Sequence, residues 1–122
     1  MFGSILKSLL TKGSMTGQVD NLSIDDIRKG LSDNSIILVD VREPNEWEAG
    51  HIPGSVLLPL SVFDADAIPD PQGRRIVLSC RSGNRSLKAA AIARAGGVPI
   101  DAHYAGGFLD WVAQGGPVET GP

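Results

Sequence analysis

The stretch Ile76-Val77-Leu78-Ser79-Cys80-Arg81-Ser82-Gly83-Asn84-Arg85-Ser86 decides the fold that this sequence predicts. It opens with a short apolar run of the kind found in strands buried on both faces, as in a parallel sheet covered by helices. A loop containing one glycine follows. An alanine-rich helical pattern then runs from about Arg85 to Ala95 and ends at Gly96-Gly97. A strand, a short loop and a helix in direct succession indicate an α/β domain.

The sequence on either side repeats this alternation. Ser23, followed three residues later by Asp26, is a helix N-cap pattern. The apolar face of that helix would consist of Ile24, Ile27 and Leu31. Ile36–Val39 is a second buried strand, and Pro44 opens a short helical stretch that reaches Trp47.

Near the C-terminus, Ile100–Tyr104 predicts a last strand and Phe108–Val112 a last short helix. Strands that alternate with helices along the chain predict an α/β fold with a mostly parallel central sheet.

The chain has 122 residues, of which 42% are hydrophobic, and this suffices for one domain with its own core. A joint containing Gly13 and Gly17 separates an N-terminal extension, residues 1–15, from a single domain over residues 16–122. Apolar residues recur at helical spacing within the extension, as in a short amphipathic helix. A helix that contacts a membrane or a partner is one interpretation; a frayed or docked extension is the one we favour, because short isolated helices are marginal in water.

Composition excludes several classes of protein. A net charge of −3 and a pI near 5.2 argue against nucleic-acid binding, which requires a basic face. Lys7 interrupts the apolar run that a signal peptide would need, and the segment is too short to span a bilayer. The single cysteine cannot form an internal disulfide, and no Cys/His cluster has metal-ligand spacing. We expect a cytoplasmic protein without a metal or an organic cofactor.

Cys80 lies where an open α/β sheet binds ligands, at the carboxyl end of a strand. The amides of the loop and of the helix N-terminus favour negative charge there. Together with Arg81 and Arg85 they are expected to push the thiol toward the nucleophilic thiolate, and Gly83 lets several amides turn inward. A lone cysteine after an apolar strand can equally be a small core residue. The two arginines and the glycine beside it favour a function.

Several separated motifs resemble the rhodanese family in order and spacing. They are Val39–Trp47, Gly50–Ser55, the Cys80 loop, and Gly106-Gly107 with Trp111, and the match runs from about Val19 to Pro117. The resemblance implies a rhodanese-like three-layer α/β/α domain with the cysteine at the floor of a shallow pocket. It also implies a sulfurtransferase that takes sulfane sulfur from thiosulfate or a persulfide donor, stores it on Cys80, and passes it to cyanide, a small-molecule thiol or a protein thiol, for example on a thioredoxin-like protein.

The resemblance also assigns roles around Cys80, the expected catalytic residue. Arg42 and the loop residues Arg81, Ser82, Gly83, Asn84 and Arg85 are expected to bind the substrate. Asp40 and Ser86 are expected to support the site. Asp40 and Arg42 share one face of a strand end, and a supporting role and a purely structural ion pair both remain open. Asn84 and Ser86 are also candidates to cap the following helix.

The remaining aromatic and histidine residues are interpreted as structural. His51 lies in a turn that enters a strand and is not expected to act as a base for Cys80, while His103 is expected to be a packing or surface residue. Trp47 and Trp111 are expected to anchor the core.

Two alternatives remain beside sulfur transfer. Phosphatases that resemble this family have a longer loop than the six residues from Cys80 to Arg85, so a phosphatase or arsenate reductase ranks second among enzymes. A non-catalytic rhodanese module that binds a partner or relays sulfur is the alternative from another class. Retention of the cysteine and of both loop arginines favours catalysis.

Overall fold

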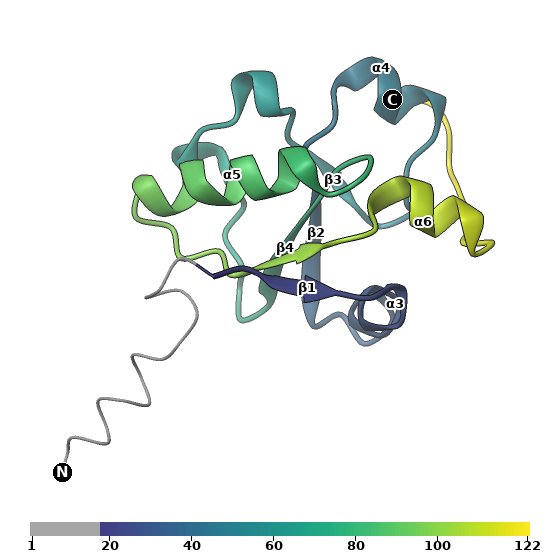
Figure 1. The fold of residues 1–122 in the computed structure, drawn as a ribbon, viewed down its shortest axis with the longest axis horizontal. Helices are drawn as coiled ribbons and strands as arrows, with labels where there is room; N and C mark the ends of the chain where they lie inside the picture. The colour runs from purple at the N-terminus through teal and green to yellow at the C-terminus, as the bar shows by residue number, and fades with distance from the viewer. Residues whose placement is uncertain (1–17) are drawn as a thin grey trace, which may run out of the picture.

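The computed structural model describes residues 18–122. They form a five-stranded parallel sheet in the order β1-β5-β4-β2-β3 (Figure 1). The strands are β1 (Asp20–Leu22), β2 (Ile36–Asp40), β3 (Val56–Leu57), β4 (Arg75–Ser79) and β5 (Ala102–Tyr104). The helices are α3 (Ile24–Ser32), α4 (Pro44–Ala49), α5 (Asn84–Ala95) and α6 (Gly107–Ala113), with short 3₁₀ turns η1 (Leu60–Val62) and η2 (Ala65–Ala67). The predicted α/β/α fold class is confirmed.

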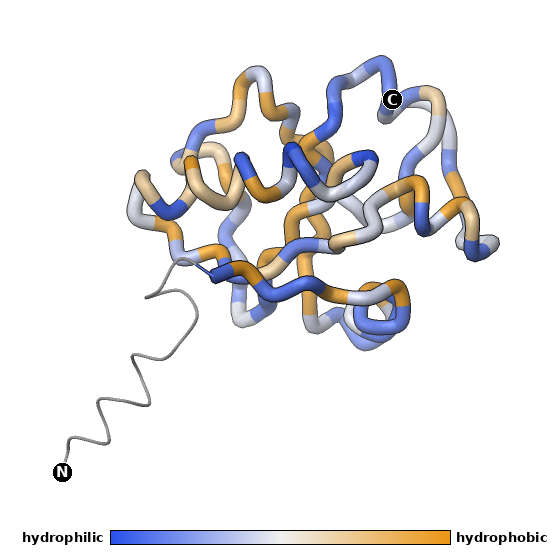
Figure 2. The backbone as a smooth tube through the Cα atoms, in the orientation of Figure 1, coloured by the Kyte–Doolittle hydropathy of each residue, from blue (hydrophilic) through white to orange (hydrophobic). Residues whose placement is uncertain are grey.

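Two hydrophobic clusters cover the two faces of the sheet. Successive side chains of a strand point to opposite faces, so each central strand contributes to both clusters. On β2, Ile37 and Val39 join the cluster under α5, whereas Ile36 and Leu38 join the cluster under α3. In Figure 2 the hydrophobic residues gather along these central strands. On β4 the same alternation places Cys80 on the α5 face, together with Ile76 and Leu78.

The helix boundaries follow the caps that the sequence predicts. At the start of α3, Asp26 N–H donates to Ser23 Oγ at 3.3 Å and Ser23 N–H donates to Asp26 Oδ2 at 2.9 Å, which confirms the predicted N-cap. α4 begins at Pro44 as expected, and a second capping box joins Glu43 to Glu46. The last predicted strand is shorter than expected and begins at Ala102.

The edge strand β1 was not predicted, whereas the short edge strand β3 lies where the turn at His51 was expected to enter a strand. β1 has the sequence Asp-Asn-Leu and β3 comprises two residues, so neither carries the period-two pattern that identifies a strand. The predicted N-terminal helix and the proposed domain start near residue 16 lie outside the described residues. No helix within residues 18–122 is long and apolar enough to cross a membrane.

Candidate active site

The candidate site lies at the carboxyl ends of the two central strands. Ser79, the last residue of β4, pairs with Asp40, the last residue of β2, and Val41 N–H donates to Ser79 O at 2.8 Å. Cys80 therefore follows directly from a strand that is held on both sides, which is where open α/β sheets bind ligands. Cys80 is 1% exposed.

Gly83 shapes the loop after Cys80. It is the N-cap residue of α5 and has a φ of +100°, a backbone conformation that side chains disfavour. A Cβ atom there would lie 2.6 Å from Ala105 O. This conformation directs Gly83 N–H at Cys80 Sγ, at 3.1 Å. The expected capping role of Asn84 and Ser86 is wrong, because Gly83 occupies the cap position and no side chain caps the helix.

The Gly106-Gly107 motif holds the loop from its other side. Phe108 N–H donates to Cys80 O at 2.9 Å, and Leu109 N–H donates to Arg81 O at 3.1 Å. Gly107 has a φ of +65°, and a Cβ atom there would lie 2.6 Å from Cys80 O. Backbone contact this close excludes any side chain at Gly107, so the motif serves the loop rather than a substrate directly.

Three groups of the protein approach the sulfur atom. Besides Gly83 N–H, Ser86 N–H lies 3.4 Å from Cys80 Sγ and Ser86 Oγ lies 3.6 Å from it. Burial raises the pKa of the Cys80 thiol, but the Ser86 hydroxyl and the amides of Ser86, Gly83 and Ser82 outweigh burial, so the pKa lies below its usual value. The loop amides were expected to have this effect together with Arg81 and Arg85; the Ser86 hydroxyl and the amides lower the pKa of Cys80, and neither arginine contributes to that shift.

Arg85 is bound by a carboxylate that the sequence analysis did not identify. Its Nη1 and Nη2 donate to the two Glu46 carboxylate oxygens at 2.7 Å and 2.9 Å. The Arg85 guanidinium lowers the pKa of Glu46 to about 2. The pKa of Arg85 is raised mainly by Glu46 and to a smaller degree by the charges of Cys80 and Asp40. The guanidinium is thus within electrostatic reach of the sulfur but is already paired.

The other predicted substrate-binding residues of the loop face solvent. Arg81, Ser82 and Asn84 are exposed. Within residues 18–122, the Arg81 side chain makes no hydrogen bond or ion pair. It is therefore a cation available at the surface beside the cysteine.

Arg42 and Asp40 form a buried ion pair. Arg42 Nη2 donates to Asp40 Oδ2 at 2.8 Å and to Gly50 O at 2.8 Å, and the guanidinium lies 4.2 Å from the centre of the Phe108 ring. Arg42 is 3% exposed. This arrangement favours the structural role for the pair, and substrate contact by Arg42 stays a prediction.

The two histidines have different surroundings. His51 Nδ1 lies 2.8 Å from Trp47 O, and its ring stacks on Trp47 with centroids 3.7 Å apart, consistent with a structural residue. His103 is 2% exposed, and its Nδ1 lies 2.7 Å from Ser86 Oγ. His103 is thus buried as expected, but it contacts a side chain that touches the sulfur. Sequence reasoning missed this link, because it depends on β5 lying beside β4.

Trp47 and Trp111 are both buried, which confirms them as core residues. Within residues 18–122, no three His, Cys, Asp or Glu side chains group in a way that could hold a metal ion.

Comparison with known proteins gives consistent matches. The family model of the rhodanese-like domain matches residues 23–114. An uncharacterized protein of Synechocystis is 42% identical over 69% of this chain, which spans 47% of that relative. The thiosulfate:glutathione sulfurtransferase of Saccharomyces cerevisiae is 32% identical, and the match covers 80% of this chain and 81% of the yeast protein. Among solved structures, the human single-domain sulfurtransferase TSTD1 has a TM-score of 0.66 at 28% identity and covers 77% of this chain and 96% of its own. Relatives named for sulfur transfer support a general role in that chemistry.

Proposed function

Because this chain belongs to the rhodanese-like domain family, we propose that it is a thiosulfate sulfurtransferase that carries sulfane sulfur as a persulfide on Cys80. The observation that carries the proposal is the convergence of two backbone amides and one hydroxyl on Cys80 Sγ. These groups favour a negatively charged sulfur at the end of a strand, where a nucleophile is needed.

The reaction consists of two displacements at sulfur. The Cys80 thiolate attacks the outer sulfur of thiosulfate; a bond forms between Sγ and that sulfur, the S–S bond of thiosulfate breaks, and sulfite leaves with the electron pair. An acceptor nucleophile then attacks the outer sulfur of the persulfide, and the Sγ–S bond breaks to restore the thiolate. Two half-reactions on one enzyme group predict ping-pong kinetics.

The charges around the loop suit an anionic donor. Arg81 is exposed and available to bind thiosulfate, while Arg85 adds a partly neutralised charge beside the sulfur. Ser82 and Asn84 complete the exposed rim of the loop. Arg42 joins Asp40 at the end of β2 to Gly50 O, and Asp40 pairs with Ser79, the residue before Cys80, so the ion pair would support the site.

A thiol is the proposed biological acceptor. The yeast relative is named for glutathione, which makes a small-molecule thiol the first candidate. A protein thiol, such as that of a thioredoxin-like partner, would react in the same way, and a reducing compartment such as the cytoplasm would supply either one.

The experiment is an intact-mass measurement after incubation with thiosulfate. We expect a gain of one sulfur atom, lost again on addition of cyanide or dithiothreitol, and neither adduct nor turnover in Cys80→Ser. Sulfur transfer retained by Cys80→Ser would overturn the proposal. Absence of any adduct in the native chain would favour the non-catalytic module, and efficient Cys80-dependent hydrolysis of aryl phosphates would favour the phosphatase.

A further inference from the structure

A chain of hydrogen bonds leads away from Cys80 into the sheet. Cys80 Sγ lies 3.6 Å from Ser86 Oγ, Ser86 Oγ lies 2.7 Å from His103 Nδ1, and His103 Nε2 lies 2.8 Å from Asn21 Oδ1. The four residues come from the loop, α5, β5 and β1, and the strand order β1-β5-β4 brings them together. Ser86 is fully buried and His103 is 2% exposed, so the contacts from Cys80 to Ser86 and from Ser86 to His103 are shielded from water.

The hydrogen bond to Asn21 determines which nitrogen of His103 carries the proton. A carbonyl oxygen only accepts hydrogen bonds, so His103 Nε2 must donate to Asn21 Oδ1. In the neutral imidazole this leaves Nδ1 as an acceptor, directed at the Ser86 hydroxyl. Burial lowers the pKa of His103 below its usual value, which favours the neutral ring whose Nδ1 carries a lone pair.

The Ser86 hydroxyl links the imidazole to the sulfur. Its single proton has two oxygen or nitrogen acceptors within reach, His103 Nδ1 at 2.7 Å and Gly83 O at 3.1 Å, and the histidine is nearer. When Ser86 donates to His103, its oxygen lone pairs are free to accept from the Cys80 S–H. Both hydrogen bonds then point in the same direction: the thiol donates to the hydroxyl, and the hydroxyl donates to the imidazole.

We propose that His103 takes up the proton of the Cys80 thiol through the Ser86 hydroxyl, with Asn21 holding the imidazole in the accepting tautomer. The S–H bond of Cys80 breaks as that proton bonds to Ser86 Oγ, and the original Ser86 O–H bond breaks as its proton bonds to Nδ1. Thiol and imidazole become thiolate and imidazolium, with no change of oxidation state.

The charged state is as fully hydrogen-bonded as the neutral one. The imidazolium donates from Nδ1 to Ser86 Oγ and from Nε2 to Asn21 Oδ1, while the Ser86 hydroxyl now donates to the thiolate. When the acceptor displaces Cys80 from the persulfide, the same path returns the proton to the departing thiolate. The proposal rests on the proposed use of Cys80 as the nucleophile, and in it His103 is a positioning residue that acts through Ser86.

Other charged groups near His103 are paired among themselves. Arg75 bridges Asp20 of β1 and Asp101 beside β5, at 2.8 Å and 3.2 Å. Arg85, next to Ser86 on α5, is bound by Glu46, and Tyr104 donates to Asp110. Burial is the cause that lowers the His103 pKa, and none of these charged groups shifts it.

The test is the rate of Cys80 alkylation by iodoacetamide as a function of pH, which needs no sulfur donor. In His103→Gln the rate near pH 7 should fall about 10- to 100-fold, because a neutral amide cannot take up the proton. The difference from the native chain should close at high pH, where hydroxide removes the thiol proton. Ser86→Ala should behave similarly and add nothing to His103→Gln in the double variant, whereas Ser86→Thr, which keeps the hydroxyl, should restore the rate.

Asn21→Asp provides an outcome that misfolding cannot imitate. Asn21 is exposed, and a carboxylate opposite His103 Nε2 would stabilise the imidazolium, so Cys80 should become reactive at lower pH than in the native chain. Gln72→Glu, which adds the same charge at the opposite end of the sheet, is the matched control and should leave the profile unchanged.

The proposal would be overturned if His103→Gln kept the native pH profile of alkylation or lost the same fraction of the rate at every pH. It would also be overturned if the pH profile of Asn21→Asp matched that of Gln72→Glu. If thiosulfate forms no persulfide but alkylation depends on His103 as described, the sulfurtransferase proposal fails and the proton path stands. If persulfide forms normally in all of these variants and the alkylation rate does not change, the proton path fails and the sulfurtransferase proposal stands.

Discussion

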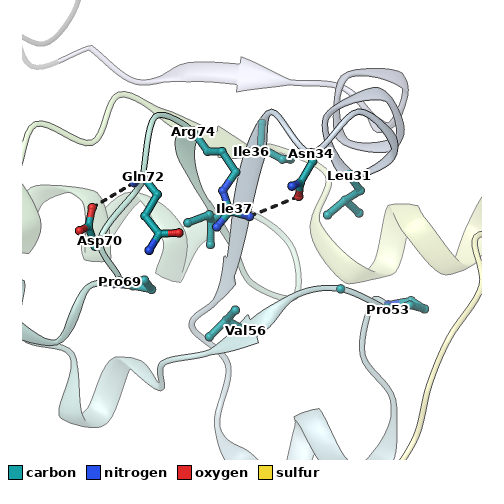
Figure 3. A pocket seen from close by; sticks show the side chains of 11 residues that line it. Leu31, Asn34, Ile36, Ile37, Pro53, Val56, Pro69, Asp70, Gln72 and Arg74 are labelled. Carbon is teal, nitrogen blue, oxygen red and sulfur yellow. Dashed lines mark hydrogen bonds between the residues drawn. The ribbon is translucent and has the colours of Figure 1, made fainter.

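The two ends of the sheet differ: a cavity lies at the amino ends of the strands, and the candidate active site lies at their carboxyl ends. At the amino ends of β2, β3 and β4 lies a cavity of about 510 Å³ (Figure 3). Its side chains include Leu31, Asn34, Ile36, Ile37, Pro53, Val56, Pro69, Asp70, Gln72 and Arg74. Polar groups there bind one another: Arg74 donates to Asn34 Oδ1 at 3.3 Å and Gln72 N–H donates to Asp70 Oδ1 at 3.0 Å.

At the carboxyl ends, by contrast, Cys80 is almost completely buried, yet several donors converge on one atom. Parallel strands present their carboxyl ends to helix N-termini, whose amides lack partners within the helix. The comparison teaches that convergence of donors, rather than the volume of a cavity, marks the end of the sheet where chemistry is expected.

The largest effect is expected from Asp40→Ala, which leaves Arg42 buried without its carboxylate. Removing one partner of a buried ion pair costs about 3–5 kcal/mol of unfolding free energy. Arg74→Ala, at the opposite end, removes only an exposed hydrogen bond to Asn34 and should change stability by about 0.5 kcal/mol or less. Denaturant unfolding of both variants measures the difference, and similar losses would contradict the assigned role of the pair.

Gly83→Ala should reduce kcat/KM for thiosulfate about 100-fold, comparable to losing one preorganised backbone donor. The new Cβ would lie 2.6 Å from Ala105 O and would displace the amide that donates to Cys80. Gly73→Ala is the matched control, since Gly73 also has a positive φ, of +82°, but no atom within 4 Å of the added Cβ. Steady-state kinetics should show a normal kcat/KM for Gly73→Ala; equal losses would mean that backbone strain alone matters.

The arginines beside the sulfur should differ in their effect on thiosulfate. Arg81 is unpaired within the described residues, so it is available to bind thiosulfate. Arg81→Ala should raise KM for thiosulfate roughly tenfold, because a charge-assisted contact contributes about 1.5 kcal/mol. Arg85→Ala should raise KM less, because Glu46 already offsets its charge, and Glu46→Gln should lower KM. A neutral persulfide donor serves as the control, since its KM should respond little to any of the three. Equal effects on both donors would show that the arginines do not act by charge.

The smallest effect is expected on the free energy of unfolding when the pH is lowered. The pKa of Glu46 is about 2 in the folded protein and near 4.5 when unperturbed, so the ionised form is favoured by folding. This contribution to stability is fully present above pH 4.5 and is lost as pH falls toward 2. After screening at this half-buried site it should be on the order of 1–2 kcal/mol. Unfolding of Glu46→Gln at pH 6 and pH 3 should show a correspondingly weaker pH dependence, and an unchanged one would contradict the assigned pair.

The sequence by itself determined the elements whose signals are local. The buried strands β2 and β4, the N-cap at Ser23, the alanine-rich α5 and the position of Cys80 at a strand end all follow from patterns within a few residues. Gly83 could also be recognised, because a strand that turns directly into a helix requires a residue tolerant of positive φ.

Only the tertiary structure decided which side chains meet. Strand order placed His103 and Asn21 beside Ser86, and the packing of α4 brought Glu46 to Arg85. The edge strand β1 pairs with β5 although its own residues carry no strand pattern. His103 and Asn21 are 82 positions apart, and local periodicity contains no information about such partners.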